Sequence, residues 1–141
     1  MKALNKILIV IIILLITSDI EILNSEEVVS AGPIVTHAQD VWINALEWCE
    51  SRGNPKNINP KDKDNTPSYY SYQFKPGTFR YYGEKYKVIE TKQTDAKVKE
   101  LMKSQTLQRT IVENMLTDKK VKWDHEFPDC VKNKIGYPPT Y

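Results

Sequence analysis

The sequence predicts a small, mainly helical (α+β) domain with at most a small β-hairpin and one disulfide. Three stretches place apolar residues at helical spacing, whereas only one short aromatic-rich stretch is typical of a strand. The chain also holds only two cysteines, Cys49 and Cys130, which are far apart in the sequence. Its 141 residues fit one domain.

Residues 1–31 are predicted to be a signal peptide or a membrane anchor followed by a linker. Two lysines precede the uninterrupted apolar run 7–16. This run suits a secretory signal and is short for a membrane-spanning helix, which needs about 20 residues. The alternative is an uncleaved anchor over residues 7–23. In both cases the N-terminal segment engages the membrane at least during export, and residues 32–141 form a secreted or extracytoplasmic domain.

The charge of this exported part favours an anionic partner. The leader removes two lysines and four acidic residues, so residues 32–141 carry a net charge of +4. A modest positive charge suits cell-wall polymers or membrane surfaces. Basic residues are scattered rather than gathered in a stripe, so we expect no nucleic-acid partner.

Both cysteines lie in the exported part, where an oxidising compartment favours one disulfide between Cys49 and Cys130. This disulfide would close a loop of about 80 residues, which on the chain-entropy model contributes on the order of 4 kcal/mol to stability. The alternative is a zinc site that adds His37 and His125. Their spacing is not that of zinc ligands, so we predict no metal and no cofactor.

The first helix is predicted from Thr36 to the break at Gly53 and Pro55. Its apolar positions recur at helical spacing and comprise Val41, Trp42, Ala45, Leu46 and Cys49. Glu50 therefore lies in the last turn, one position beyond the core-facing Cys49.

The middle of the chain predicts a loop up to Pro67, because Pro, Asn, Asp and Lys dominate it. Residues 69–74 are aromatic-rich and predict a short strand or turn. Pro76-Gly77-Thr78 suits the start of a helix, which we expect Gly83 to end.

Two further helices are predicted, the first with Thr94 as its N-cap. Its apolar face comprises Val98, Leu101 and Met102; that of the second comprises Leu107, Ile111, Val112, Met115 and Leu116. Trp123, Phe127 and Cys130 then return the C-terminal segment to the core.

Glu50 is the candidate catalytic residue. If Cys49 is bonded to Cys130, the helix end is rigid and the carboxyl group projects at the edge of a loop. Aromatic neighbours would lower the local polarity and raise the pKa of Glu50, which suits a general acid. The alternative is a solvated glutamate without a role. His37 and His125 have no partner spacing that supports catalysis.

The stretch "CESRGNPKNINPKDKDNTPSYYSYQFKPGTF" resembles the signature of the lysozyme-like superfamily, specifically soluble-lytic-transglycosylase-type and resuscitation-promoting-factor-type domains. Those families carry Glu-Ser-Gly-Gly-Asn-Pro after a first helix, then Gly-Leu-(Met/Phe)-Gln and Pro-x-Thr. The matching residues are Glu50, Ser51, Gly53, Asn54, Pro55, Gln73, Phe74, Pro76 and Thr78. A cysteine before the glutamate, bonded to one near the C-terminus, is also familiar from such relatives.

The resemblance implies helices around a substrate groove and a monomer that cleaves peptidoglycan glycan strands. Glu50 would protonate the bridging oxygen of the β-1,4 bond between N-acetylmuramic acid and N-acetylglucosamine, with the substrate's N-acetyl group stabilising the cationic centre. Glu50 would then accept a proton from the muramyl 6-hydroxyl, closing a 1,6-anhydro ring, or from water. Ser51 and Gln73 would orient substrate and backbone, and Tyr69 would line the sugar groove. Asp62 and Asp64 are the nearby candidates for a second carboxylate.

Two departures keep alternatives open. Arg52 stands where the family has glycine, and Tyr70-Ser71 stands where it has Gly-Leu. A tyrosine at position 70 would narrow the groove or shift the substrate. We therefore expect a lytic transglycosylase. The alternatives are a muramidase-type hydrolase, an inactive wall-binding module of the same fold, and an unrelated disulfide-stapled interaction domain.

Overall fold

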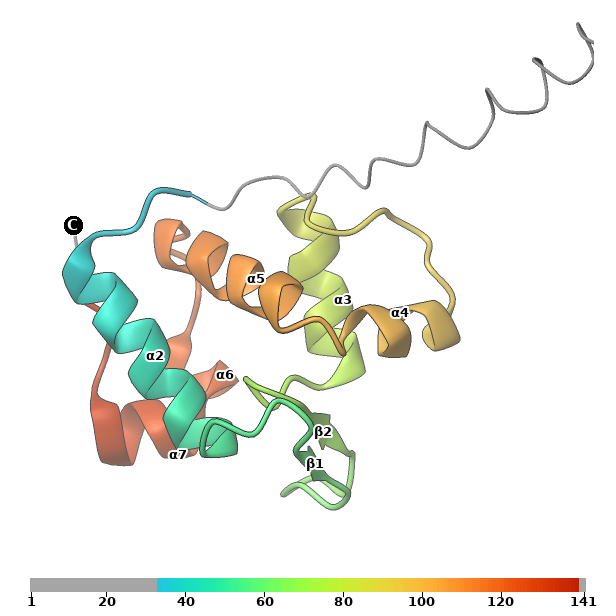
Figure 1. The fold of residues 1–141 in the computed structure, drawn as a ribbon, viewed down its shortest axis with the longest axis horizontal. Coiled ribbons are helices and arrows are strands. Elements are labelled where there is room, and N and C mark those ends of the chain that lie inside the picture. The colour runs from blue at the N-terminus through green and yellow to red at the C-terminus, as the bar shows by residue number, and fades with distance from the viewer. Residues whose placement is uncertain (1–32, 140–141) are drawn as a thin grey trace, which may run out of the picture.

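The computed structural model describes residues 33–139 (Figure 1). The predicted leader 1–31 and the alternative anchor 7–23 lie outside the described residues. Within the described part, no helix has the length and apolarity needed to cross a membrane. The elements in chain order are α2 (His37–Ser51), β1 (Ile58–Asn59), β2 (Ser68–Tyr69), α3 (Pro76–Lys85), α4 (Asp95–Leu101), α5 (Gln105–Thr117), α6 (Trp123–Glu126), α7 (Pro128–Cys130) and the π-helix η1 (Val131–Ile135). The fold is therefore mainly helical, as predicted.

Helix α2 starts and ends on local signals in the sequence. The Thr36 hydroxyl accepts from the backbone N–H of Gln39 at 3.3 Å, and the Gln39 side chain accepts from the N–H of Thr36 at 2.8 Å. This capping box satisfies two donors that a helix start leaves free. At the other end Arg52 adopts a left-handed conformation and donates its N–H to the carbonyl of Trp48 at 2.9 Å. The predicted helix is confirmed.

The predicted apolar stripe of α2 is wrong at one edge. Trp42 and Leu46 are buried as expected, but Val41 is 54% exposed. The buried face instead includes Gln39 and Ile43. The face is rotated because α2 packs against both α5 and the C-terminal helices, so that its buried residues follow the spacing i, i+3, i+4 and i+7.

The small β element is confirmed and is shorter than the aromatic stretch that predicts it. β1 pairs antiparallel with β2, with Ile58 opposite Tyr69 and Asn59 opposite Ser68. Residues 70–73 form a turn, after which the carbonyl of Phe74 accepts from the N–H of Tyr69 at 3.0 Å. The hairpin and its turn thus connect α2 to α3.

Gly83 does not end α3, contrary to the prediction. The helix continues to Lys85, and Gly83 is buried inside it. A Cβ atom built on Gly83 would lie 2.9 Å from Cγ1 of the buried Ile89. The glycine is therefore explained by the close approach of the following chain, not by a helix stop.

The later helices form as predicted. Thr94 and Ser104 cap α4 and α5 by accepting backbone N–H groups at 3.2 and 3.3 Å. The buried apolar residues contributed by α4, α5 and their junction are Val98, Met102, Leu107, Ile111, Val112 and Met115, with Leu101 and Leu116 partly buried. Trp123, Phe127 and Cys130 are all buried, so the C-terminal segment does return to the core.

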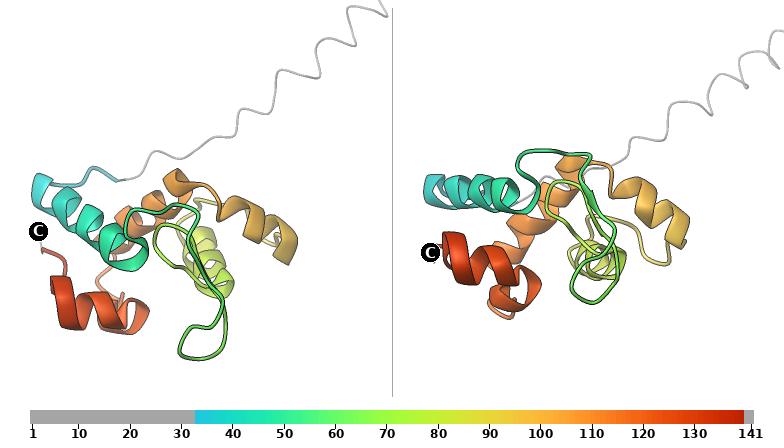
Figure 2. Two further views of the ribbon diagram at one scale, coloured as in Figure 1. Left: turned by 60° about the horizontal axis from the view of Figure 1, so that its bottom comes forward. Right: turned by 90° about the horizontal axis from the view of Figure 1, so that it is seen from below.

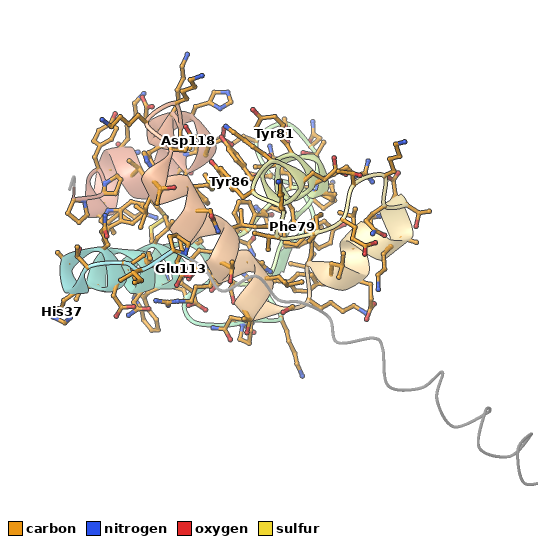
Figure 3. All side chains as sticks on the ribbon, turned by 90° about the horizontal axis from the view of Figure 1, so that it is seen from above. His37, Phe79, Tyr81, Tyr86, Glu113 and Asp118 are labelled. Carbon is orange, nitrogen blue, oxygen red and sulfur yellow. A yellow bond between two sulfur atoms is a disulfide. The ribbon has the colours of Figure 1, made fainter. Side chains whose placement is uncertain are left out.

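Polar side-chain contacts link neighbouring helices. On α5, Arg109 donates to Glu113 at 2.9 Å and reaches Asn44 on α2 at 2.8 Å. At the far end of α5, the hydroxyl of Tyr86 donates to Asp118 at 2.9 Å, and Figure 3 shows these two residues at the junction of α3 with the end of α5. Both views in Figure 2 show α2 beside the C-terminal helices, against which it packs.

Gly83→Ala is expected to destabilise the domain by about 1–3 kcal/mol, because the added methyl group overpacks the contact with Ile89. Gly77→Ala, in the first turn of the same helix, is the matched control, since nothing lies within 4 Å of its added Cβ. It should stabilise by up to about 1 kcal/mol through helix propensity. Urea unfolding of both variants tests this, and equal effects at the two positions would refute the close-approach explanation.

Candidate active site

A cavity of about 570 Å³ lies where the C-terminal end of α2 meets the C-terminal helices. One wall comes from the loop around β1 and β2 and from the start of α3; the other comes from residues 125–134. These segments can be followed in Figure 1, from the end of α2 to α7 and to the hairpin. The cavity is thus assembled from parts of the chain that are far apart in sequence.

The predicted disulfide is confirmed and lies in the cavity wall. Cys49 and Cys130 are bonded, with their Cα atoms 5.8 Å apart and a sequence separation of 81. Both thiols are therefore used, and no group of three His, Cys, Asp or Glu side chains within residues 33–139 is placed to hold a metal ion. The covalent bond fixes the residue before Glu50 to the opposite wall.

Glu50 lines this cavity from the last turn of α2. Its side chain is partly buried, and the burial raises the pKa of the carboxyl group to about 7. Lys134 acts in the opposite direction, whereas Asp129 and Asp62 raise the pKa further. Removing a carboxylate from water disfavours its charged form, which is why burial dominates.

A carboxyl group with a pKa of about 7 exists in both protonation states near neutral pH. It can therefore donate a proton to a leaving group and later accept one, as a general acid and base must. The position on a helix that a disulfide anchors also limits the movement of the carboxyl group. The pKa of Glu50 is raised in the direction that the sequence predicts, but the expected aromatic neighbours Tyr69 and Tyr70 do not line the cavity.

Gln73 lies in the same cavity wall and is held by three hydrogen bonds. Its amide nitrogen donates to the carbonyls of Asn57 at 3.1 Å and Tyr70 at 2.7 Å. Its amide oxygen accepts from the hydroxyl of Ser68 at 3.0 Å. Gln73 thus fixes the turn after β2 against the loop before β1, which is the wall that faces Glu50.

The other two predicted substrate-binding residues lie outside the cavity lining. Ser51 is buried, and its hydroxyl donates to the carbonyl of Glu47 at 3.1 Å, inside the last turn of α2. Tyr69 is partly buried, with its ring 5.7 Å from that of Tyr70. Of the four predicted site residues, Glu50 and Gln73 therefore share the cavity lining, whereas Ser51 and Tyr69 do not.

Tyr70 also lies outside the lining of the cavity around Glu50. Its ring packs against Tyr69 and the edge of the core. Its backbone has φ 65°, in the left-handed region that favours glycine. The tyrosine thus occupies a glycine-like backbone conformation without placing its side chain in this cavity.

The wall formed by residues 125–134 was not predicted from the sequence. Asp129 pairs with Lys63 at 2.6 Å, which joins this wall to the loop between β1 and β2. Glu126 accepts from the hydroxyl of Tyr82 at 2.9 Å. The available signal was the disulfide itself, because pairing Cys130 with Cys49 places the neighbours of Cys130 opposite Glu50.

The raised pKa of Glu50 predicts a pH-dependent contribution to stability. The folded state holds the proton more tightly than the unfolded chain, whose ordinary pKa is 4.5. The stabilisation is therefore complete below about pH 4.5 and is lost as the pH rises through about 7. Relative to Glu50→Gln, we expect the wild type to lose on the order of 2 kcal/mol over this range, after allowance for partial solvent exposure.

Urea unfolding of both proteins between pH 4 and pH 8 measures this difference. Parallel stability curves, or a wild type that gains stability relative to Glu50→Gln as the pH rises, would show that the carboxyl group is not desolvated in the folded protein.

Comparison with known proteins returned no match: no family model, no curated protein and no solved structure matches this chain. The candidate active site is therefore defined by the geometry of the chain itself. Its central feature is a glutamate with a pKa of about 7 in the wall of a cavity. A disulfide next to this glutamate holds the two walls together.

Proposed function

We propose that this chain is a lytic transglycosylase that cleaves the β-1,4 bond between N-acetylmuramic acid and N-acetylglucosamine in peptidoglycan. The observation that carries the proposal is the carboxyl group of Glu50, which lines a cavity of about 570 Å³ and has a pKa of about 7. A glycosidase needs such an acid to protonate the leaving oxygen. No cofactor enters the reaction.

Glu50 acts twice in the proposed reaction. It first donates its proton to the bridging oxygen as the bond to the muramyl C1 breaks, and the N-acetyl group of the same sugar stabilises the positive charge. Glu50, now a carboxylate, then accepts the proton of the muramyl 6-hydroxyl while the oxygen of that hydroxyl bonds to C1. The product ends in a 1,6-anhydro ring, and Glu50 is protonated again.

The other carboxylates of the cavity favour this one-acid scheme. Lys75 lies 2.5 Å from Asp64 and 3.8 Å from Asp62, and its hydrogen bond to Asp64 lowers the pKa of that carboxyl group well below its usual range. Asp129 is paired with Lys63. A carboxylate already neutralised by a lysine is poorly suited to stabilise a sugar cation. Glu126, which also lines the cavity, accepts from the hydroxyl of Tyr82 at 2.9 Å. Glu50, whose pKa is raised to about 7, is the acid that we assign to the chemistry.

The sequence motif supports the same proposal. Glu50 and Gln73, which stand at the family's glutamate and glutamine positions, line one cavity. The left-handed backbone of Tyr70 suits the glycine that the family has there, and its side chain does not line that cavity. These features make active chemistry a better proposal than an inactive wall-binding module.

Peptidoglycan lies outside the cytoplasm, and the proposed enzyme works there as a secreted or membrane-anchored monomer. The disulfide agrees with this location, because such bonds persist in oxidising compartments.

The proposal predicts that the oxidised protein releases soluble, anhydro-ended fragments from purified peptidoglycan, read by mass spectrometry. Glu50→Gln should reduce their yield by about 100-fold or more, the usual effect of losing a general acid. Glu47→Gln, on the same helix but outside the cavity lining, is the control and should leave the yield unchanged.

Three other results would each revise the proposal. Reducing-ended fragments would make the protein a muramidase-type hydrolase with the same acid. Binding to the wall without fragments would make it an inactive wall-binding module. If the protein neither binds nor cleaves the wall, the resemblance is contradicted, and the alternative that remains is an unrelated disulfide-stapled interaction domain.

A further inference from the structure

Lys134 is a cavity residue for which the proposed chemistry has no use. It lies on η1, four residues after Cys130, and lines the same cavity as Glu50. Its positive charge lowers the pKa of the Glu50 carboxyl group, against the larger effect of burial.

The backbone that carries Lys134 is anchored on both sides to the helix that carries Glu50. Before it, Cys130 is bonded to Cys49. After it, the carbonyl of Gly136 accepts from the indole N–H of the buried Trp42 at 3.0 Å. The position of Lys134 relative to Glu50 is therefore set by a covalent bond and a long-range hydrogen bond, not by a free loop.

The other lysines of the cavity are already paired. Lys63 contacts Asp129 at 2.6 Å, and Lys75 contacts Asp64 at 2.5 Å. Within residues 33–139, Lys134 forms no salt bridge. Its ammonium group is thus the cavity cation that remains for an anionic ligand.

We propose that Lys134 is a specificity residue that binds a carboxylate carried by the glycan beside the bond that Glu50 cleaves. This inference rests on the proposed function and names the residue that makes the enzyme prefer acidic, muramyl-containing strands to neutral β-1,4-linked N-acetylglucosamine polymers. A carboxylate can come from two parts of such a strand: the peptide stem, or the lactyl group once the stem is removed. Both offer the same charge-assisted hydrogen bond to an ammonium group.

Binding to the Glu50→Gln protein tests the inference without cleavage. The ligands are chitotetraose, which is neutral; the matching tetrasaccharide with free lactyl carboxylates; and the same tetrasaccharide with peptide stems. Glu50→Gln should bind at least one acidic ligand about tenfold more tightly than chitotetraose, the size expected for one charged hydrogen bond. Adding Lys134→Met should abolish this preference, and adding Lys134→Arg should retain it.

Lys132→Met in the same background is the control, because Lys132 is an exposed lysine on η1 that does not line the cavity. It should leave the preference unchanged. The acidic ligand that loses affinity when Lys134→Met is added to Glu50→Gln identifies the source of the carboxylate.

Two results overturn the inference: no preference for acidic ligands in Glu50→Gln, or an equal loss for neutral and acidic ligands in Lys134→Met, which would mean a structural role. Cleavage of peptidoglycan by the wild type in parallel separates the two proposals. If fragments form while the preference is absent, only the role of Lys134 fails. If no fragment forms and no glycan binds, the proposed function fails and the role of Lys134 fails with it.

Discussion

The disulfide between Cys49 and Cys130 is the constraint on which the candidate site depends. It joins the last turn of α2 to the C-terminal helices, and each half-cystine lies next to a residue that lines the cavity: Glu50 on one side and Asp129 on the other. The cavity has two walls from distant parts of the chain, and the bond is their covalent connection. On the chain-entropy model, closing a loop of this length contributes on the order of 4 kcal/mol, a large fraction of the stability of a domain of this size.

Holding the walls together also sets the electrostatics of the site. Burial raises the pKa of Glu50, and the acidic residues that raise it further come from both walls: Asp62 from the hairpin loop and Asp129 from the C-terminal helices. Lys134, on the C-terminal wall, opposes them. The carboxyl group therefore has a pKa of about 7 only while these segments surround it. The same packing therefore forms the cavity and raises the pKa of Glu50.

Local sequence signals predicted much of the fold, and the features that were not predicted depend on long-range packing. Helix α2, the capped helices α4 and α5, and the short strand follow from residues within a turn of each other. Val41 is exposed and α3 continues through Gly83 because of the segments that pack against these helices. The spacing of apolar residues in the sequence does not show which segments these are. The motif singled out Glu50 and Gln73 as candidates, and both line the cavity, whereas Lys134 carries no sequence signal apart from its distance from Cys130.

The disulfide holds together the two walls whose packing raises the pKa of Glu50. The direct measurement is a titration of the Glu50 carboxyl carbon by NMR, in the oxidised protein and in the folded Cys49→Ser/Cys130→Ser variant. We predict a pKa near 7 with the disulfide and a pKa well below this, toward the ordinary value of 4.5, without it. A pKa near 7 in both proteins would show that the packing around Glu50 does not need the bond, and a pKa near 4.5 in the oxidised protein would contradict the proposed general acid itself.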